Sequence, residues 1–200
     1  MRTDEELMER YREGSREAFE ELFSRHHRRV IQFCYRMTGD RARAEEAAQE
    51  VFLRIARAAA TYRPTAKFST WMFTIARRST LNFLRDEKET GVKVPLAEEA
   101  DREETPGAVE IEAPADFDPE RIAWSAQLGD RFVEALQSLP ETYRTAFVLN
   151  RGDGLSYEEV AAVLGITVQA VKSRIFRARE TLMRELAGLI PVKRSGDSRV

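Results

Sequence analysis

Apolar residues recur at three- and four-residue steps along most of this 200-residue chain, which is the spacing of one face of an α-helix. The alternation typical of β-strands is scarce. The pattern predicts two helices over residues 4–37, a third after Asp40, a fourth from Ser69 to about Arg85, and two more over 121–138 and 141–150. The predicted fold class is therefore all-α.

The second of these helices is expected to carry the core of the first half. Its apolar stripe contains Phe19, Leu22, Phe23, Val30, Phe33, Cys34 and Met37. We expect these side chains to be buried, with Cys34 serving as a small apolar residue. A single cysteine cannot form an internal disulfide, which favours a reducing compartment such as the cytoplasm.

Residues 155–186 have the pattern of a helix-turn-helix. Ser156 and Glu159 form a capping box at the start of one helix, and Gly165 can supply the left-handed backbone that ends it. Thr167 then caps a second helix. The buried stripe of that helix is expected to contain Val171, Ile175, Ala178, Leu182 and Leu186. In such a motif the second helix enters the major groove of DNA.

Polar and basic residues, together with Phe176, lie off this stripe. Gln169, Lys172, Ser173 and Arg177 are placed to reach base edges or phosphates, whereas Arg174 and Arg179 are better placed for phosphates alone. The alternative is a solvated basic face, the common use of such a helix. The two caps and the glycine turn, in register with the basic face, favour DNA binding.

The helix after Asp40 has a second candidate surface. Opposite its apolar face lies a polar group that includes Glu46, Gln49, Glu50 and Arg54. This polar face is either ordinary solvated surface or a docking face for a large partner.

A third candidate surface surrounds Pro64, which favours a loop over residues 61–67. Aromatic rings can stack on unpaired bases while cations contact phosphates, as single-strand binding requires. The alternative is that most of the rings are core. The candidates at this loop and on the following helix are Tyr62, Arg63, Lys67, Trp71, Arg77 and Arg78.

The net charge of −2 argues against a nucleic-acid binder, but the charge is unevenly distributed. Residues 1–86 carry +4 and residues 121–200 carry +3, whereas residues 87–120 carry −9 and four of the seven prolines. Such a segment cannot bury enough apolar surface to fold alone. The chain is therefore expected to consist of a domain over 1–86, an acidic flexible linker over 87–120, a domain over 121–190 and a tail over 191–200.

Several classes of protein do not fit the sequence. No apolar run approaches the roughly 20 residues that cross a bilayer, and the charged amino terminus lacks the apolar stretch of a secretion signal. His26 and His27 are adjacent, so on a helix they point about 100° apart and cannot chelate one metal together. We expect no enzyme activity, no cofactor and no metal, because nucleotide-loop, metal-ligand and nucleophile motifs are missing.

In three places the chain resembles the extracytoplasmic-function sigma factors, which are promoter-specificity subunits of bacterial RNA polymerase. Residues 44–52 resemble the polymerase-binding helix of conserved region two, and residues 68–78 resemble its promoter-melting helix. Residues 138–140, 154–161 and 171–179 resemble region four. The order and spacing of these motifs cover nearly the whole chain except the linker.

The resemblance implies a role for each candidate surface. Residues 1–86 would be region two, in which Glu46, Gln49, Glu50 and Arg54 face the coiled coil of the largest polymerase subunit. The candidates around Tyr62 and Trp71 would hold the −10 promoter element and an extruded base. Residues 121–190 would be region four, whose second helix reads the −35 element, and the linker would lie in the polymerase cleft.

The partners implied by this resemblance are core RNA polymerase, promoter DNA and an anti-sigma factor, with no insertion into a membrane. The alternative is a stand-alone helix-turn-helix regulator that binds an operator without polymerase. In that case residues 1–86 would form a sensing or dimerising domain.

Overall fold

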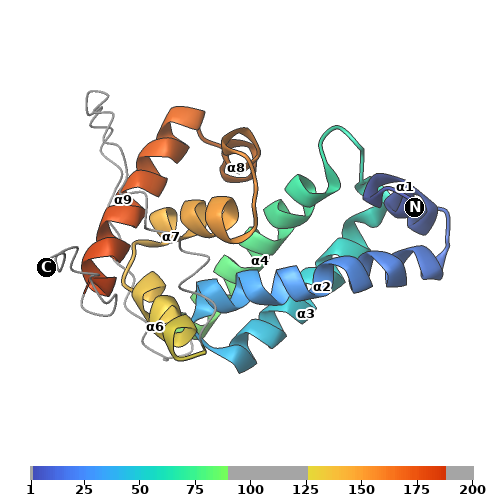
Figure 1. Ribbon diagram of the computed structural model, residues 1–200. Coiled ribbons are helices and arrows are strands. Elements are labelled where there is room, and N and C mark those ends of the chain that lie inside the picture. Colours follow the sequence, from blue (N-terminus) through green and yellow to red (C-terminus); the bar gives the residue numbers. More distant parts are fainter. Residues whose placement is uncertain (1, 90–125, 188–200) are drawn as a thin grey trace, which may run out of the picture.

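The computed structural model describes residues 2–89 and 126–187, and all regular structure in these two ranges is helical, as predicted (Figure 1). The first range contains α1 (Asp4–Arg12), α2 (Arg16–Thr38), α3 (Arg41–Ala58), the 3-10 turn η1 (Ala59–Thr61) and α4 (Phe68–Glu89). The second range contains α6 (Ala126–Gln137), α7 (Glu141–Phe147), the π-helical turn η2 (Val148–Gly152), α8 (Tyr157–Leu164) and α9 (Val168–Leu186). Residues 90–120 of the predicted linker, residues 121–125 and the predicted tail lie outside the described residues.

The predicted caps define where the helices begin. Asp40 accepts a hydrogen bond from the Arg43 amide at 2.9 Å and starts α3, directly after Gly39 has ended α2 with a φ of +75°. Ser156 and Glu159 form the predicted capping box at the start of α8. These contacts satisfy backbone groups that a helix end leaves without partners, so the local sequence fixes the ends of the helices.

Most of the predicted core stripe of α2 is buried, including Cys34, whose pKa is raised to about 11 by burial. The prediction was wrong for Phe23, which is 44% exposed. Its ring lies on the flank of α2, edge-on to Phe52 at 4.7 Å and stacked on His27 at 5.2 Å. A stripe that recurs every three or four residues drifts around a long helix, and position 23 has drifted out of the core.

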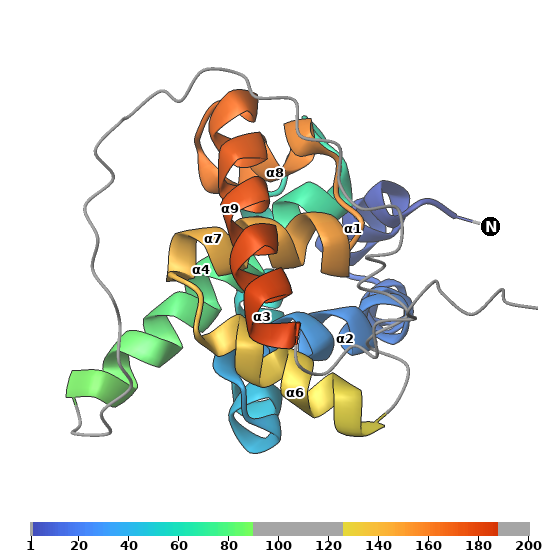
Figure 2. The same cartoon turned by 60° about the vertical axis from the view of Figure 1, so that its left-hand side comes forward.

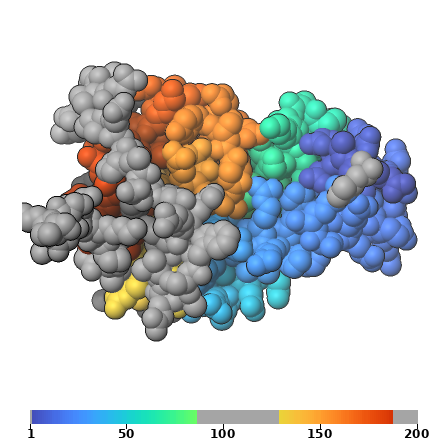
Figure 3. All heavy atoms as spheres, in the orientation of Figure 1, coloured from blue at the N-terminus to red at the C-terminus, as the bar shows by residue number. Residues whose placement is uncertain are grey.

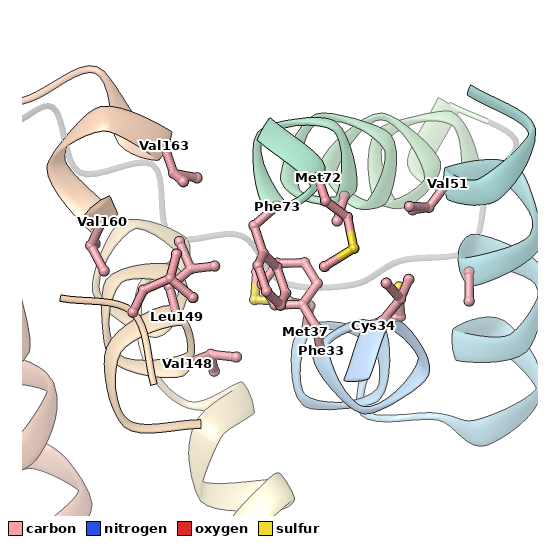
Figure 4. Close-up of a cluster of buried hydrophobic side chains, with 14 of the residues drawn as sticks. Phe33, Cys34, Met37, Val51, Met72, Phe73, Val148, Leu149, Val160 and Val163 are labelled. Atoms are coloured by element: carbon pink, nitrogen blue, oxygen red, sulfur yellow. The ribbon is translucent and has the colours of Figure 1, made fainter. Parts of the chain in front are cut away.

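The two halves of the chain share one apolar core. Figure 4 shows Leu149 of the second half facing Phe33 and Phe73 of the first, and these three residues belong with Val160 to a single cluster of buried side chains. In Figure 2, α6 lies beside α2, and Figure 3 shows the surfaces of the two halves meeting along a seam. Burying apolar surface from both halves stabilises this packed arrangement.

The carboxyl end of α2 is bonded by side chains from the second half. The carbonyl of Arg36 accepts a hydrogen bond from Gln137 Nε2 at 3.0 Å, and that of Met37 accepts one from Arg144 Nη1 at 2.8 Å. The last four carbonyls of a helix have no partner within the helix, and a cation there also complements the helix dipole. The second half therefore supplies hydrogen-bond donors to the last carbonyls of a helix of the first half.

Asp153 lies at the same seam, directly after η2. Its carbonyl accepts a hydrogen bond from Arg29 Nη2 at 2.8 Å, while its buried carboxylate lies 3.9 Å from Arg36 Nη1. That separation is longer than a hydrogen bond, and burial raises the pKa of Asp153 to about 7. Gly152 permits the close approach, because a Cβ there would lie 2.8 Å from Arg36 Nη1.

We expect Asp153→Asn to make the free energy of unfolding less dependent on pH. The raised pKa means that the folded chain binds one more proton than the unfolded chain between pH 3.8 and about 7, so this stability is present in acid and is lost as the pH rises through 7. The variant should be the more stable at pH 8, and its advantage should shrink by about 1–3 kcal/mol at pH 5.

Urea unfolding of both chains at several pH values measures this difference. The comparison removes the contribution of His26, which titrates in the opposite sense because burial lowers its pKa. A difference between the two chains that does not vary with pH would contradict the prediction.

Candidate nucleic-acid interface

The second helix of the helix-turn-helix presents its predicted DNA-binding side chains away from the core. The predicted stripe from Val171 to Leu186 is buried. Lys172 Nζ lies 5.7 Å from the centre of the Tyr157 ring, which holds the start of α9 close to α8. Of the predicted residues, Gln169, Lys172, Phe176 and Arg177 are exposed, and Ser173, Arg174 and Arg179 are half-buried.

The turn between α8 and α9 has the predicted geometry. Gly165 adopts a φ of +69°, and its amide and that of Ile166 both donate to the Ala161 carbonyl, at 2.8 and 3.2 Å. Thr167 Oγ1 then accepts from the amide of Ala170 at 3.2 Å and starts α9. The turn residues therefore set the direction in which the exposed face of α9 points.

The loop before α4 exposes two of its candidate residues and buries a third. Arg63 and Lys67 are exposed, whereas Tyr62 is only 1% exposed. The Tyr62 ring packs edge-on against Trp71 at 4.9 Å, and its hydroxyl is buried without a hydrogen-bond partner. In this arrangement an unpaired base has no access to the Tyr62 ring, because Trp71 and Phe68 pack against it.

Arg77 and Arg78 differ in their surroundings. Arg78 is exposed, whereas Arg77 is half-buried. Burial lowers the pKa of Arg77, the charge of Glu141 raises it, and Arg78 and Arg174 lower it further. Cations of α4 and α9 therefore lie near one another in the packed chain, and their charges repel.

Lys67 forms an ion pair with the second half of the chain. Its Nζ lies 2.9 Å from Glu159 Oε1, and this contact raises the pKa of Lys67 and lowers that of Glu159. The lysine side chain is 75% exposed, and ion pairs at such positions contribute about 0–1 kcal/mol. The pair therefore gives the Lys67 ammonium group a partner but adds little to stability.

The predicted docking face lies on α3. Glu46 and Gln49 are exposed, and Arg54 Nε donates to Glu50 Oε1 at 2.6 Å. Beside this face, a groove of about 270 Å³ lies between α2 and α3, and its lining is Phe23, His27, Ile31, Glu45, Ala48, Gln49 and Phe52.

Sequence reasoning missed the exposed apolar part of this docking face. Leu53 is 52% exposed and follows Glu46, Gln49 and Glu50 on the same side of α3, and Phe23 lies at the groove. The spacing 46, 49, 50, 53 was a signal for Leu53, because residues three and four apart share a helix face. A single exposed leucine is common on protein surfaces, but Leu53 shares its side of α3 with the predicted docking residues and so adds apolar area to that face.

Among residues 2–89 and 126–187, no three histidine, cysteine, aspartate or glutamate side chains gather closely enough to hold a metal ion. Nor is any helix of these two ranges both long and apolar enough to cross a membrane.

Comparison with known proteins finds a family model that matches each half of the chain. The family model of Sigma-70 region 2 matches residues 22–90, and that of Sigma-70 region 4 matches residues 129–182. The RNA polymerase sigma factor CarQ of Myxococcus xanthus is 37% identical over 181 residues, which cover 90% of this chain and 95% of CarQ. The ECF RNA polymerase sigma-E factor of Escherichia coli K12 is 34% identical, covering 94% of this chain and 96% of the relative.

Two solved structures have a similar fold at 24% sequence identity. One is CnrH in complex with the cytosolic domain of CnrY, with a TM-score of 0.67 and coverage of 92% of this chain and 97% of the other. The second is the sigma factor RpoE in complex with the anti-sigma factor NepR from Bartonella quintana. Its TM-score is 0.63, with coverage of 84% of this chain and 96% of the other.

We expect Tyr62→Phe to leave stability unchanged or to raise it by about 0.5–1 kcal/mol, because the buried hydroxyl has no partner to lose. Tyr35→Phe is the matched control, since the Tyr35 hydroxyl donates to Asp130 at 3.1 Å; it should lose about 0.5–1 kcal/mol. Urea unfolding measures both. A loss of stability in Tyr62→Phe as large as that in the control would show that this hydroxyl is bonded.

Proposed function

The chain belongs to the extracytoplasmic-function family of RNA polymerase sigma factors, and we propose which of its described surfaces perform the steps of transcription initiation. It directs core RNA polymerase to specific promoters. The matched regions cover both halves of the chain, which a stand-alone operator-binding regulator does not require.

The −35 element is assigned to the exposed face of α9. A recognition helix reads base edges with side chains near its amino end, and Gln169, Lys172, Ser173 and Arg177 lie within its first three turns. Arg174 and Arg179 are assigned to phosphates. Phe176 adds an apolar surface, 39% exposed, that suits a thymine methyl group.

The −10 element is assigned to the exposed side of the loop and of α4. Arg63, Lys67 and Arg78 supply cations for the backbone of a melted strand, which a single-strand binder needs along its length. Trp71 and Arg77 are half-buried and stand at the edge of this surface. Tyr62 is assigned a supporting role, because it packs beneath the loop.

Core polymerase is assigned to the α2–α3 surface. Glu46, Gln49, Glu50 and Arg54 supply polar contacts, while Phe23 and Leu53 supply the exposed apolar area. Interfaces combine an apolar centre with a polar rim, and a few large side chains at the centre carry most of the affinity. This surface lies apart from α9, so docking leaves the −35 reader accessible.

We propose that the two halves separate when the chain binds a promoter. In the packed chain Lys67 is paired with Glu159, and Arg77 is half-buried near Glu141 and Arg174. Separating α4 from α8 would release Lys67 from Glu159 and move Arg77 away from Arg174. Polymerase would supply the energy for separation by binding the open arrangement more tightly than the packed one.

Sigma factors are regulatory proteins, and we propose that this chain has no catalytic activity of its own. We place it in the cytoplasm, where polymerase and promoter DNA meet. The anti-sigma partner that the resemblance implies stays a prediction.

The observation that carries these assignments is the pair of exposed phenylalanines on different helices. Phe23 beside the α3 carboxylates is 44% exposed, and Phe176 among the α9 cations is 39% exposed, so truncating either should spare the fold. We expect Phe23→Ala to weaken core binding by about 1–2 kcal/mol and to leave −35 preference intact. Phe176→Ala, the matched control, should weaken the −35 preference and leave core binding intact.

The measurements are equilibrium binding to core polymerase and run-off transcription from promoters with an intact or altered −35 element. Run-off that does not depend on adding the chain would contradict its function as a sigma factor. Equal loss of core affinity in both variants would contradict the assignment of the two surfaces.

A further inference from the structure

Helix α1 precedes the matched region 2, which begins at residue 22, yet it is built into the first half of the chain. Leu7 and Met8 are fully buried in the core. The Asp4 carboxylate accepts a hydrogen bond from Arg25 Nη1 at 2.7 Å and lies 2.7 Å from His26 Nε2. These contacts fix α1 against α2.

From this position α1 holds both ends of the loop over residues 62–67. Glu5 Oε1 accepts the amide hydrogen of Phe68, the first residue of α4, at 2.7 Å. Arg12 Nη1 donates to the Tyr62 carbonyl, at the start of the loop, at 3.4 Å. The loop between these two contacts carries the exposed side chains of Arg63 and Lys67.

The contact made by Glu5 is the stronger of the two. The first amides of a helix have no acceptor within the helix, so they donate to an acceptor from elsewhere. A carboxylate at this place forms a charge-assisted hydrogen bond and complements the positive end of the helix dipole. A carboxylate 63 positions away in sequence therefore bonds the first amide of α4, at the point where the loop ends.

We propose that Glu5 is a positioning residue for the −10 element, acting through the amide of Phe68 on the placement of Arg63 and Lys67. The inference rests on the proposed function of the loop. It assigns to α1 a role in promoter melting that is separate from docking to polymerase, because the α2–α3 docking surface does not include Glu5.

Three substitutions of Glu5 distinguish its hydrogen bond to the Phe68 amide from its negative charge. Glu5→Gln keeps an oxygen that can accept the Phe68 amide, Glu5→Asp keeps the charge but shortens the side chain, and Glu5→Met keeps the length but removes the acceptor. Glu6→Met is the matched control on the same helix. It removes the capping-box contact of Glu6 with the Thr3 amide, at 3.0 Å, and leaves the loop contacts in place.

The assay uses holoenzyme made from the full chain and core polymerase. The template is a promoter mapped from the transcript starts of this factor, together with a library in which its −10 bases are randomised. We expect Glu5→Met to lower run-off about 5- to 20-fold and to flatten base preference at the −10 element, while core affinity stays within about twofold. The run-off and the −10 base preference of Glu5→Asp should lie between those of Glu5→Met and those of the natural chain.

Glu5→Gln should retain most of the run-off and the natural base preference, as should Glu6→Met. Unchanged preference in both Glu5→Met and Glu5→Asp would overturn the inference, as would an equal loss in Glu5→Met and Glu6→Met. Loss of core affinity in parallel with run-off would overturn it as well, since a general defect of the fold would then explain the result.

Failure of the proposed function gives a different result. If Arg63→Ala and Lys67→Ala leave −10 preference unchanged, the loop itself does not read this element. If those two variants alter the preference and the Glu5 variants do not, only the role of Glu5 is wrong.

Discussion

The structure depends on which groups donate hydrogen bonds to the last carbonyls of α2. The carbonyls of Arg36 and Met37 would be without partners at the end of an isolated helix. Gln137 and Arg144 from the second half supply both donors, and the half-buried guanidinium of Arg144 also donates to the Leu139 carbonyl. One arginine thus joins the end of α2 to the turn that starts α7, which fixes how the two halves meet over their shared apolar core.

The same seam contains features that keep the packing reversible. Arg36 Nη1, Asp153 Oδ2 and Arg144 Nε are buried without hydrogen-bond partners, and each such group costs stability. Arg77 and Arg174 add like-charge repulsion, and the exposed pair between Lys67 and Glu159 contributes little. The shared apolar core therefore stabilises an arrangement that polar and charged groups weaken. That balance suits the proposed separation of the two halves on the polymerase.

The sequence predicted the elements whose causes are local. Ser156, Gly165 and Thr167 act on backbone groups within a few residues, so their caps and turn could be inferred from spacing alone. The buried stripe of α9 followed from its periodicity for the same reason. The exposure of Phe23 could not be inferred, because the drift of a long stripe depends on which helices cover it.

Contacts between distant segments were also beyond prediction. Nothing in the sequence pairs Arg144 with Met37 or Glu5 with Phe68, since each pair becomes adjacent only after the helices pack. The burial of Tyr62 has the same origin, because an aromatic residue in a loop has equal grounds for stacking on a base and for packing on its neighbours. The candidate surfaces could be predicted, but the way in which they cover one another could not.

The most direct test of this account is the distance between the two halves with and without polymerase. Labels at Thr65→Cys and Ala162→Cys, exposed positions in the loop and on α8, would report it by pulsed electron-spin resonance. Cys34 resists labelling because it is buried and its thiol pKa is raised to about 11. The account predicts one short distance in the free chain and a longer one in the holoenzyme. A distance that is already long in the free chain, or that does not change when core polymerase is added, would contradict it.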